Sequence, residues 1–290
     1  MRALAAAVLV AAALHVAPAA AAAAVALRDD AGRAVRLEHA ARRVITLAPF
    51  LTELVYDVGA GATLVGVSEH SDWPAAARSL PQVGNAFDFS LERIAALRPD
   101  LVLVWKDSVR ASDIERIESF GARVFVLQAR SIDDVPRALA NVATLVGGDA
   151  VGHARAFREK IARLRARYAQ RRTLSVLLEI WHDPLTTVAG AHFINEALEA
   201  CGARNAFADL PGVAPPIPWE EVYRRDPEVV VSVSEGTTRE AFLRAWQSRP
   251  TLRAVRSGKL VFLPPDRLQR QSARLADGVE ELCAALERVR

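Results

Sequence analysis

The chain has 290 residues, of which 51% are hydrophobic and 24% are charged. This composition is typical of a folded globular protein with room for two lobes of about 100–130 residues, and it argues against a disordered chain or a repeat array. The formal net charge is only +3, and the many arginines are interleaved with nearly as many acids, so nucleic acid is not an expected partner.

The first 24 residues have the composition of a secretory signal peptide. Arg2 is followed by an apolar stretch and then by small residues that offer several Ala-x-Ala cleavage sites, so we expect export and cleavage near Ala24. The alternative is an uncleaved membrane anchor, because apolar residues run from Ala3 to Leu27, interrupted by His15 and Pro18. No cysteine follows this stretch, so a lipid anchor is not indicated.

Residues 25–147 alternate between strand and helix patterns after a hairpin that is expected to turn at "DDAG". The expected strands are 43–47, 64–67, 101–105 and 123–127. The expected helices are one with Leu51, Leu54, Val55 and Val58 on one face, then 90–97, 111–119 and one from about Ser131 to "LVGG". Such alternation predicts an α/β lobe with a mostly parallel sheet and helices on both faces.

Residues 148–172 form a separate helical segment. One apolar stripe at spacings of three and four consists of Ala154, Phe157, Ile161, Leu164 and Tyr168. Because a helix of about 20 residues spans about 30 Å, this helix is long enough to join two lobes as a rigid bridge. The alternative is a surface helix packed on one sheet only.

Residues 173–290 resume the alternation and predict a second, similar α/β lobe. The expected strands are 174–180, 229–233 and "KLVFL". The expected helices are one that carries Ile194, Ala197, Leu198 and Cys201, then 219–225, about 238–247 and a last helix from Ser272. The unit "SLERIAALRPDLVLVW" at 90–105 is written again as "PWEEVYRRDPEVVVSV" at 218–233. The repeated helix-Pro-strand unit therefore occupies a corresponding place in each lobe.

Long loops follow several of the predicted strands. In open parallel sheets, ligands bind beyond the carboxyl ends of the strands, and long loops in compact domains are usually functional. The candidate ligand-binding residues in these loops are His70, Trp73, Phe87, Trp105, Trp181, Asp266 and Arg270. Rings from both lobes, with one acid and one base, suit a large flat or amphipathic ligand. The alternative for each aromatic is packing on its own lobe.

Catalytic motifs are weak or missing. There is no Gly-x-Ser-x-Gly elbow, phosphate-binding loop or His-Glu-x-x-His, and the third glycine of a dinucleotide fingerprint is absent after Gly59 and Gly61. We therefore expect no catalytic residues and no resident cofactor or metal. The alternative of another class is an exported metal-dependent enzyme or metallochaperone that uses His70, His182 and Asp266.

The two cysteines, Cys201 and Cys283, both lie beyond the signal peptide. In an oxidising compartment they can pair. A bridge with a sequence separation of 82 (283 minus 201) would stabilise the fold by roughly 4 kcal/mol on the chain-entropy model. The alternative is two buried free thiols that pack as small apolar residues.

Three stretches resemble the periplasmic solute-binding proteins of ABC importers for cobalamin, haem and ferric siderophores: "RVITLAPFLTELVYDVGAGATLVGVSEHSDWP", "SLERIAALRPDLVLVW" and "EACGARNAF". The resemblance, which runs from about Arg43 to the end, implies the class III fold of that family. That fold has two α/β lobes, one long rigid helix between them and a cleft that closes little. We therefore expect a periplasmic monomer that is not an enzyme. Its partners would be a small-molecule ligand and the membrane permease of an ABC importer.

Family members dock on the permease through one glutamate on each lobe. By motif position the candidates are Glu92 in "SLERI" and Glu220 in "PWEEV", at the same place in each copy of the repeated unit. Two carboxylates at opposite ends of one face would meet arginines of a symmetric-looking partner. The alternative for Glu92 is local, because an acid is favoured in the first turn after an N-capping Ser90.

The cobalamin site of the family is matched in part. Trp105, Asp266 and Arg270 match pocket positions, and Trp181 lies near an aromatic one. His70 stands where cobalamin-binding members have tyrosine. Two pocket tryptophans are replaced, by Ala86, which is next to Phe87, and by Ala214. The cysteine pair matches the family, which supports the disulfide.

Cobalamin is the expected transported ligand, with haem or a ferric siderophore as the alternative. In that alternative, His70 is a candidate iron ligand, and Arg130 and Arg270 are candidate partners of ligand carboxylates.

Overall fold

We describe a computed structural model of the protein that covers residues 24–190 and 192–290. Within these ranges, no helix is both long enough and apolar enough to cross a membrane. The expected signal peptide, its cleavage near Ala24 and the alternative anchor concern a segment that lies almost wholly outside the described residues.

The N-terminal lobe is built on a four-stranded parallel sheet. Its strands are β3 (Val44–Thr46), β4 (Leu64–Val67), β5 (Leu101–Trp105) and β6 (Arg123–Leu127), in the order β4-β3-β5-β6. The antiparallel hairpin of β1 (Val25–Arg28) and β2 (Ala34–Leu37) precedes them. The alternation predicted from sequence is confirmed here, because buried apolar strands such as 101–104 need cover on both faces.

Helices cover both faces of this sheet. On one face lie α1 (Pro49–Asp57) and α4 (Val135–Val146), and on the other lie α2 (Leu91–Ala96) and α3 (Ala111–Ser119). Short 3-10 helices occupy Gly61–Thr63, Ala75–Ser79 and Ile132–Asp134. Ser90 caps α2, its side chain accepting the backbone N–H of Arg93 at 3.2 Å.

The C-terminal lobe repeats this topology. Its parallel strands are β7 (Leu174–Glu179), β10 (Ala203–Asn205), β11 (Val229–Ser232) and β12 (Leu260–Phe262), in the order β10-β7-β11-β12. In both sheets the first strand along the chain lies between the second and the third, and the fourth lies at the edge. The repeated sequence unit is α2 with β5 in one lobe and α7 (Trp219–Arg225) with β11 in the other, as predicted.

The helices of the C-terminal lobe also lie on both faces of its sheet. One layer consists of α6 (Phe193–Ala200) and α11 (Leu275–Val289). The other consists of α7, α8 (Arg239–Gln247) and α9 (Arg253–Arg256).

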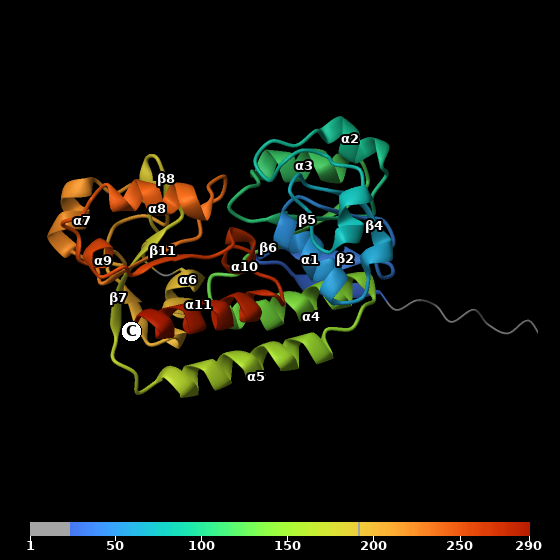
Figure 1. Cartoon of the computed structure of the whole chain (residues 1–290). Helices are drawn as coiled ribbons and strands as arrows, with labels where there is room; N and C mark the ends of the chain where they lie inside the picture. Colours follow the sequence, from blue (N-terminus) through green and yellow to red (C-terminus); the bar gives the residue numbers. More distant parts are fainter. Residues whose placement is uncertain (1–23, 191) are drawn as a thin grey trace, which may run out of the picture.

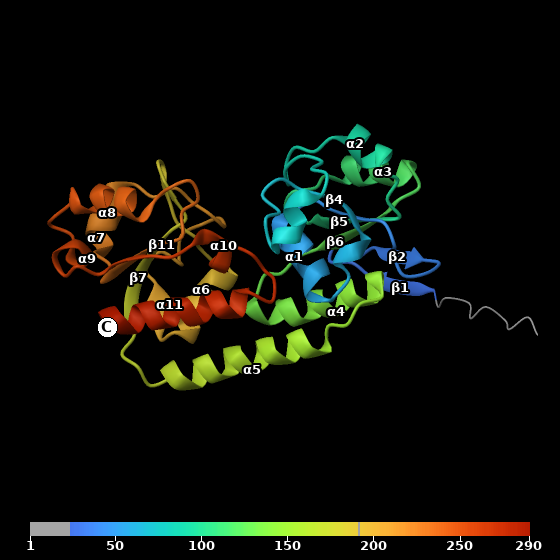
Figure 2. The ribbon, with the colours of Figure 1, turned by 45° about the vertical axis from the view of Figure 1, so that its right-hand side comes forward.

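One long helix, α5 (Val151–Tyr168), joins the two lobes and runs beneath both of them (Figures 1 and 2). Its predicted stripe, Ala154, Phe157, Ile161, Leu164 and Tyr168, is buried. The helix packs on α4 of the first lobe and on α6 and α11 of the second. The alternative of a surface helix on a single sheet is therefore wrong, because one apolar core runs along α5 through both lobes.

The predicted disulfide is present between Cys201 and Cys283. It joins the C-terminal end of α6 to α11, and both cysteines are fully buried. The alternative of two free thiols is therefore wrong.

Several short elements were not predicted. The segment after β7 forms a small hairpin, β8 (Trp181–His182) with β9 (Leu185–Thr186), and α10 (Pro265–Leu268) lies in a stretch that we expected to be a loop. Such elements are too short for a periodic pattern to reveal. The last helix begins at Leu275 rather than Ser272 because residues just before it bond to the N-terminal lobe: the Ala273 N–H donates to Asp57 at 2.9 Å.

Candidate functional site

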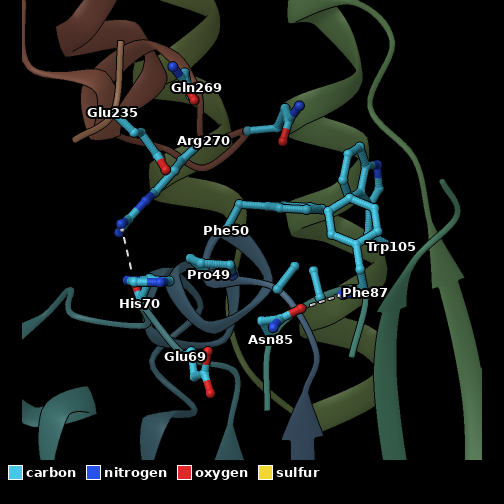
Figure 3. A pocket seen from close by; sticks show the side chains of 13 residues that line it. Pro49, Phe50, Glu69, His70, Asn85, Phe87, Trp105, Glu235, Gln269 and Arg270 are labelled. Carbon is cyan, nitrogen blue, oxygen red and sulfur yellow. Dashed lines mark hydrogen bonds between the residues drawn. The ribbon is translucent and has the colours of Figure 1, made fainter. Parts of the chain in front are cut away.

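A cavity of about 440 Å³ lies between the lobes, at the carboxyl ends of the parallel strands. The N-terminal lobe lines it with residues that follow β3 and β4, with Trp105 at the end of β5, and with the 85–87 loop. The C-terminal lobe lines it with Glu235 and with residues 269–271. The full set is Ala48, Pro49, Phe50, Glu69, His70, Asn85, Ala86, Phe87, Trp105, Glu235, Gln269, Arg270 and Gln271 (Figure 3).

A second cavity of about 480 Å³ adjoins the first, since Phe87, Trp105 and Gln271 line both. Its other walls come from Asp107 after β5, from residues 128–130 after β6 and from the start of α6, with Val213 and Ala214 from a loop of the C-terminal lobe. The two cavities form one cleft with walls from both lobes, of a size typical of small-molecule sites.

The N-terminal lobe presents an aromatic wall to this cleft. The rings of Phe87 and Trp105 meet edge to face with 5.9 Å between centroids, and Phe50 meets Trp105 in the same way at 6.5 Å. Phe87 is 69% exposed, an unusual state for a large apolar side chain. This wall offers a flat ligand a broad apolar contact surface.

The positive charge of Arg270 is already neutralised by two carboxylates of the protein. Its Nη1 donates to Glu53 at 2.9 Å and to Asp72 at 2.7 Å, and its Nη2 donates to the carbonyl of His70 at 3.2 Å. Burial works against the charged form of Arg270, but the hydrogen bonds and charges of Asp72 and Glu53 raise its pKa above the ordinary value. Burial would likewise raise the pKa of Asp72, yet the bond to Arg270 holds it below the ordinary value.

The remaining charges of the cleft are mostly negative. Among the described residues, Glu69 and Glu235 have no cation within 4.0 Å, and Asp107 accepts only a neutral hydrogen bond, from Gln128 at 2.8 Å. Arg130 is the one cleft cation of the described ranges without a carboxylate in that distance. The cleft therefore carries three unneutralised carboxylates against one guanidinium.

Two histidines line the cleft in different states. Burial lowers the pKa of His192 to about 4, so its ring is neutral at neutral pH. Its Nδ1 accepts the backbone N–H of Ile194 at 3.2 Å and caps α6, which places the remaining ring proton on Nε2. His70 is exposed, and within the described chain neither of its ring nitrogens has a hydrogen-bond partner.

Four of the seven residues predicted to bind ligand lie together at the first cavity: His70, Phe87, Trp105 and Arg270. The other three lie outside the walls of both cavities, and their role in binding stays a prediction. Trp73 is stacked under the Arg274 guanidinium at 4.5 Å, and Asp266 bonds to Arg274 at 3.2 Å. Trp181 lies on the β8–β9 hairpin, where its Nε1 donates to the Asp183 carbonyl at 2.9 Å.

The three residues of the alternative metal site do not lie together in the structure. Over residues 24–190 and 192–290, no group of three His, Cys, Asp or Glu side chains is placed to hold a metal ion, and this includes His70, His182 and Asp266. His182 instead lies 3.4 Å from the buried carboxylate of Glu179 and packs edge to face on Trp219.

The two glutamates predicted to dock on a permease are exposed, each in the first turn of its helix, α2 or α7. In the part of the chain that the structure describes, neither has an ion-pair partner. Glu221, next to Glu220, is by contrast held by Arg224 and Arg225. Glu92 and Glu220 are thus free to bind a partner, and their docking role stays a prediction.

Sequence reasoning missed several polar residues of the cleft: Glu69, Asn85, Glu235, Gln269, Gln271 and His192. Glu69 and Gln269 were within reach of prediction, because each is adjacent to a chosen residue in a loop at a strand end. Glu235 follows β11 in a loop that we did not single out, although β11 holds the same place in its sheet as β5, which ends at Trp105.

Two parallel α/β lobes, a rigid bridging helix and a ligand-sized cleft between the lobes define a solute-binding protein of the two-lobed class. The chain belongs to the periplasmic binding protein family, whose model matches residues 44–267.

The similarity extends to individual relatives. The vitamin B12-binding protein of Vibrio parahaemolyticus is 31% identical over 250 residues, which cover 86% of this chain and 90% of the relative. The crystal structure of the periplasmic vitamin B12 binding protein of Vibrio cholerae has a TM-score of 0.77 at 30% identity and covers 86% of this chain and 98% of that one. A periplasmic heme binding protein from Pseudomonas aeruginosa has a TM-score of 0.76 at 26% identity, with 84% and 92% covered.

Proposed function

We propose that the protein captures cobalamin in the cleft between its lobes and delivers it to an ABC importer, without catalysing a reaction. The similarity to vitamin B12-binding proteins over most of both chains supports this proposal. Residues 1–24 would be removed on export to the periplasm. The mature monomer would consist of an N-terminal lobe (25–147), a bridging segment (148–172) and a C-terminal lobe (173–290).

The charge balance of the cleft is the observation that carries the choice of ligand. The edge of a corrin ring bears neutral amide groups, whose N–H donors suit carboxylates such as Glu69 and Glu235. Cobalamin carries one phosphodiester, which the single unpaired cation, Arg130, can match. Asn85, Gln269 and Gln271 add neutral donors and acceptors.

Haem is the second candidate, and the exposed His70 in the cleft favours it as an iron ligand. Haem carries two propionate carboxylates, however, and Arg270 is already neutralised by Glu53 and Asp72. A propionate beside Glu69 or Glu235 would meet a like charge in a partly desolvated site. A ferric siderophore with carboxylate groups would meet the same repulsion.

Delivery would use Glu92 and Glu220 as the two contacts with the permease. They occupy equivalent places in the two lobes, at the start of α2 and of α7 (Figure 1). An exposed carboxylate without an ion-pair partner among the described residues can bind an arginine of another protein without first breaking an ion pair.

The choice of ligand is tested with the double variant Glu69→Gln and Glu235→Gln. The wild-type protein should bind cyanocobalamin more tightly than haemin, and the ratio of the two affinities should fall in the variant because the repulsion of propionates is removed. Glu159→Gln, on the exposed face of α5, is the matched control and should leave the ratio unchanged. A wild-type preference for haemin would overturn the assignment of cobalamin.

A further inference from the structure

We infer that His70 is an axial ligand for cobalt when the cleft holds a Co(III) corrinoid with an exchangeable upper position. The inference rests on the proposed function. It adds a bond between the protein and the cobalt of the bound ligand to the contacts that the cleft makes with the edge of the corrin ring.

The backbone of His70 has a conformation that is uncommon for a residue with a side chain. Its φ is 62°, in the left-handed region. The N–H of Asp72, at 3.0 Å, and Nη2 of Arg270, at 3.2 Å, both donate to its carbonyl. Because Arg270 is itself bound to Glu53, groups from both lobes hold this turn in place. A strained residue that its surroundings hold firmly is often found at a functional site.

The ring of His70 is available to a ligand in the cleft. It is exposed, it lines the first cavity, and within the described residues it makes no hydrogen bond. The other histidine of the cleft lacks this freedom, because Nδ1 of His192 already accepts an N–H and its Nε2 carries the proton. Of these two rings, His70 alone offers an unused lone pair.

The position of His70 fits an axial contact with a flat macrocycle. Figure 3 shows His70 on the opposite side of the cavity from Phe87 and Trp105. A corrin that packs one face toward that aromatic wall turns its other face, with the metal at its centre, toward the imidazole. Neutral imidazole is a common ligand of transition metals.

The reaction is a simple ligand exchange. In aquocobalamin the bond between cobalt and the upper water breaks, and the imidazole lone pair forms a cobalt–nitrogen bond in its place. The water leaves, the cobalt stays Co(III), and no reductant or oxidant is needed. In cyanocobalamin the upper position is held by cyanide, so this exchange does not occur although the corrin periphery is the same.

The experiment compares the visible spectra of the protein with aquocobalamin and with cyanocobalamin. The wild-type protein should shift the aquocobalamin bands to those that excess free imidazole produces, and leave the cyanocobalamin bands in place. His70→Asn should still bind both compounds but lose the shift, since asparagine tolerates the left-handed backbone. His70→Gly, which is free of that strain, is the second variant.

His153→Asn removes an exposed histidine on α5 that lines neither cavity, so it is the matched control and should behave as the wild type does. Binding of aquocobalamin with an unchanged spectrum, or the same shift in His70→Asn, would overturn the inference while the proposed function stands. Failure of the wild type to bind either compound would instead refute the proposed function, and the axial ligand with it.

Discussion

Arg270 of the C-terminal lobe and Glu53 of the N-terminal lobe form a buried ion pair across the lobe junction, with 2.9 Å between Nη1 and Oε1. Arg274 adds a second pair to the same carboxylate at 2.8 Å. The Glu53 side chain is fully buried, and the two arginine side chains are 12% and 10% exposed. Together with the apolar core along α5, these bonds fix the orientation of the lobes.

Removal of the Glu53 carboxylate should destabilise the protein strongly. Glu53→Ala leaves two guanidinium groups partly buried without their shared partner, and breaking a buried pair in this way costs about 3 kcal/mol or more. Urea unfolding measures the loss. Glu159→Ala, which removes exposed pairs at 3.9 and 4.0 Å on α5, should change the free energy of unfolding by less than about 1 kcal/mol. Equal effects of the two substitutions would contradict this account.

Loss of the disulfide should also lower stability. The bridge closes a sequence separation of 82 residues between α6 and α11, and its removal in Cys201→Ser with Cys283→Ser should cost roughly 4 kcal/mol. Thermal unfolding with and without a reductant gives the same comparison for the wild type. A double variant as stable as the oxidised wild type would show that the disulfide does not stabilise the fold.

Asp57 should make stability depend on pH at the lobe junction. The pKa of Asp57 is raised from 3.8 to about 6, mainly by burial and also by the charge of Glu53. The hydrogen bond from the Ala273 N–H and the charges of His153 and Arg274 act in the opposite direction and lower the pKa. Because the folded state binds this proton more tightly, the stabilisation is complete below pH 3.8 and is lost as the pH rises through about 6.

The variant Asp57→Asn isolates this contribution, since its side-chain carbonyl still accepts from Ala273. The stability of the wild type relative to the variant should fall between pH 4 and pH 6 and level off above that range. Denaturant unfolding at a series of pH values measures the difference. Parallel pH profiles for the two proteins would contradict the assignment.

Charge reversal of the two glutamates proposed to dock on the permease should separate transport from binding. Glu92→Lys with Glu220→Lys should abolish uptake through the importer, because each lysine would face the arginines that the carboxylate is proposed to meet. Ligand affinity should be unchanged, since neither residue lines the cleft. Glu199→Lys, an exposed site on α6, is the control. Uptake at the wild-type rate in the double variant would refute the docking role.

Much of the fold could be predicted from the sequence because its signals are local. Buried strands such as 101–105, the stripe of α5 and the repeated unit each show a pattern within a few turns or strands. The β8–β9 hairpin and α10 could not, because they are only a few residues long.

The site was less predictable because its properties depend on contacts distant in sequence. Arg270 could be identified as a residue of the cleft, but its neutralisation by Glu53 is a contact over 217 residues. Nor does any local pattern show that Asp266 bonds to Arg274 rather than lining a cavity. The charge balance that favours cobalamin became visible only once these partners were known.

The central claim is that the cleft of this protein binds cobalamin. Calorimetric titration of the mature, ligand-free protein with cyanocobalamin, and separately with haemin, tests it most directly. We expect one-to-one, submicromolar binding of cyanocobalamin that is weakened in Trp105→Ala, because the aromatic wall loses its central ring. Tight binding of haemin with no measurable binding of cyanocobalamin would contradict the claim.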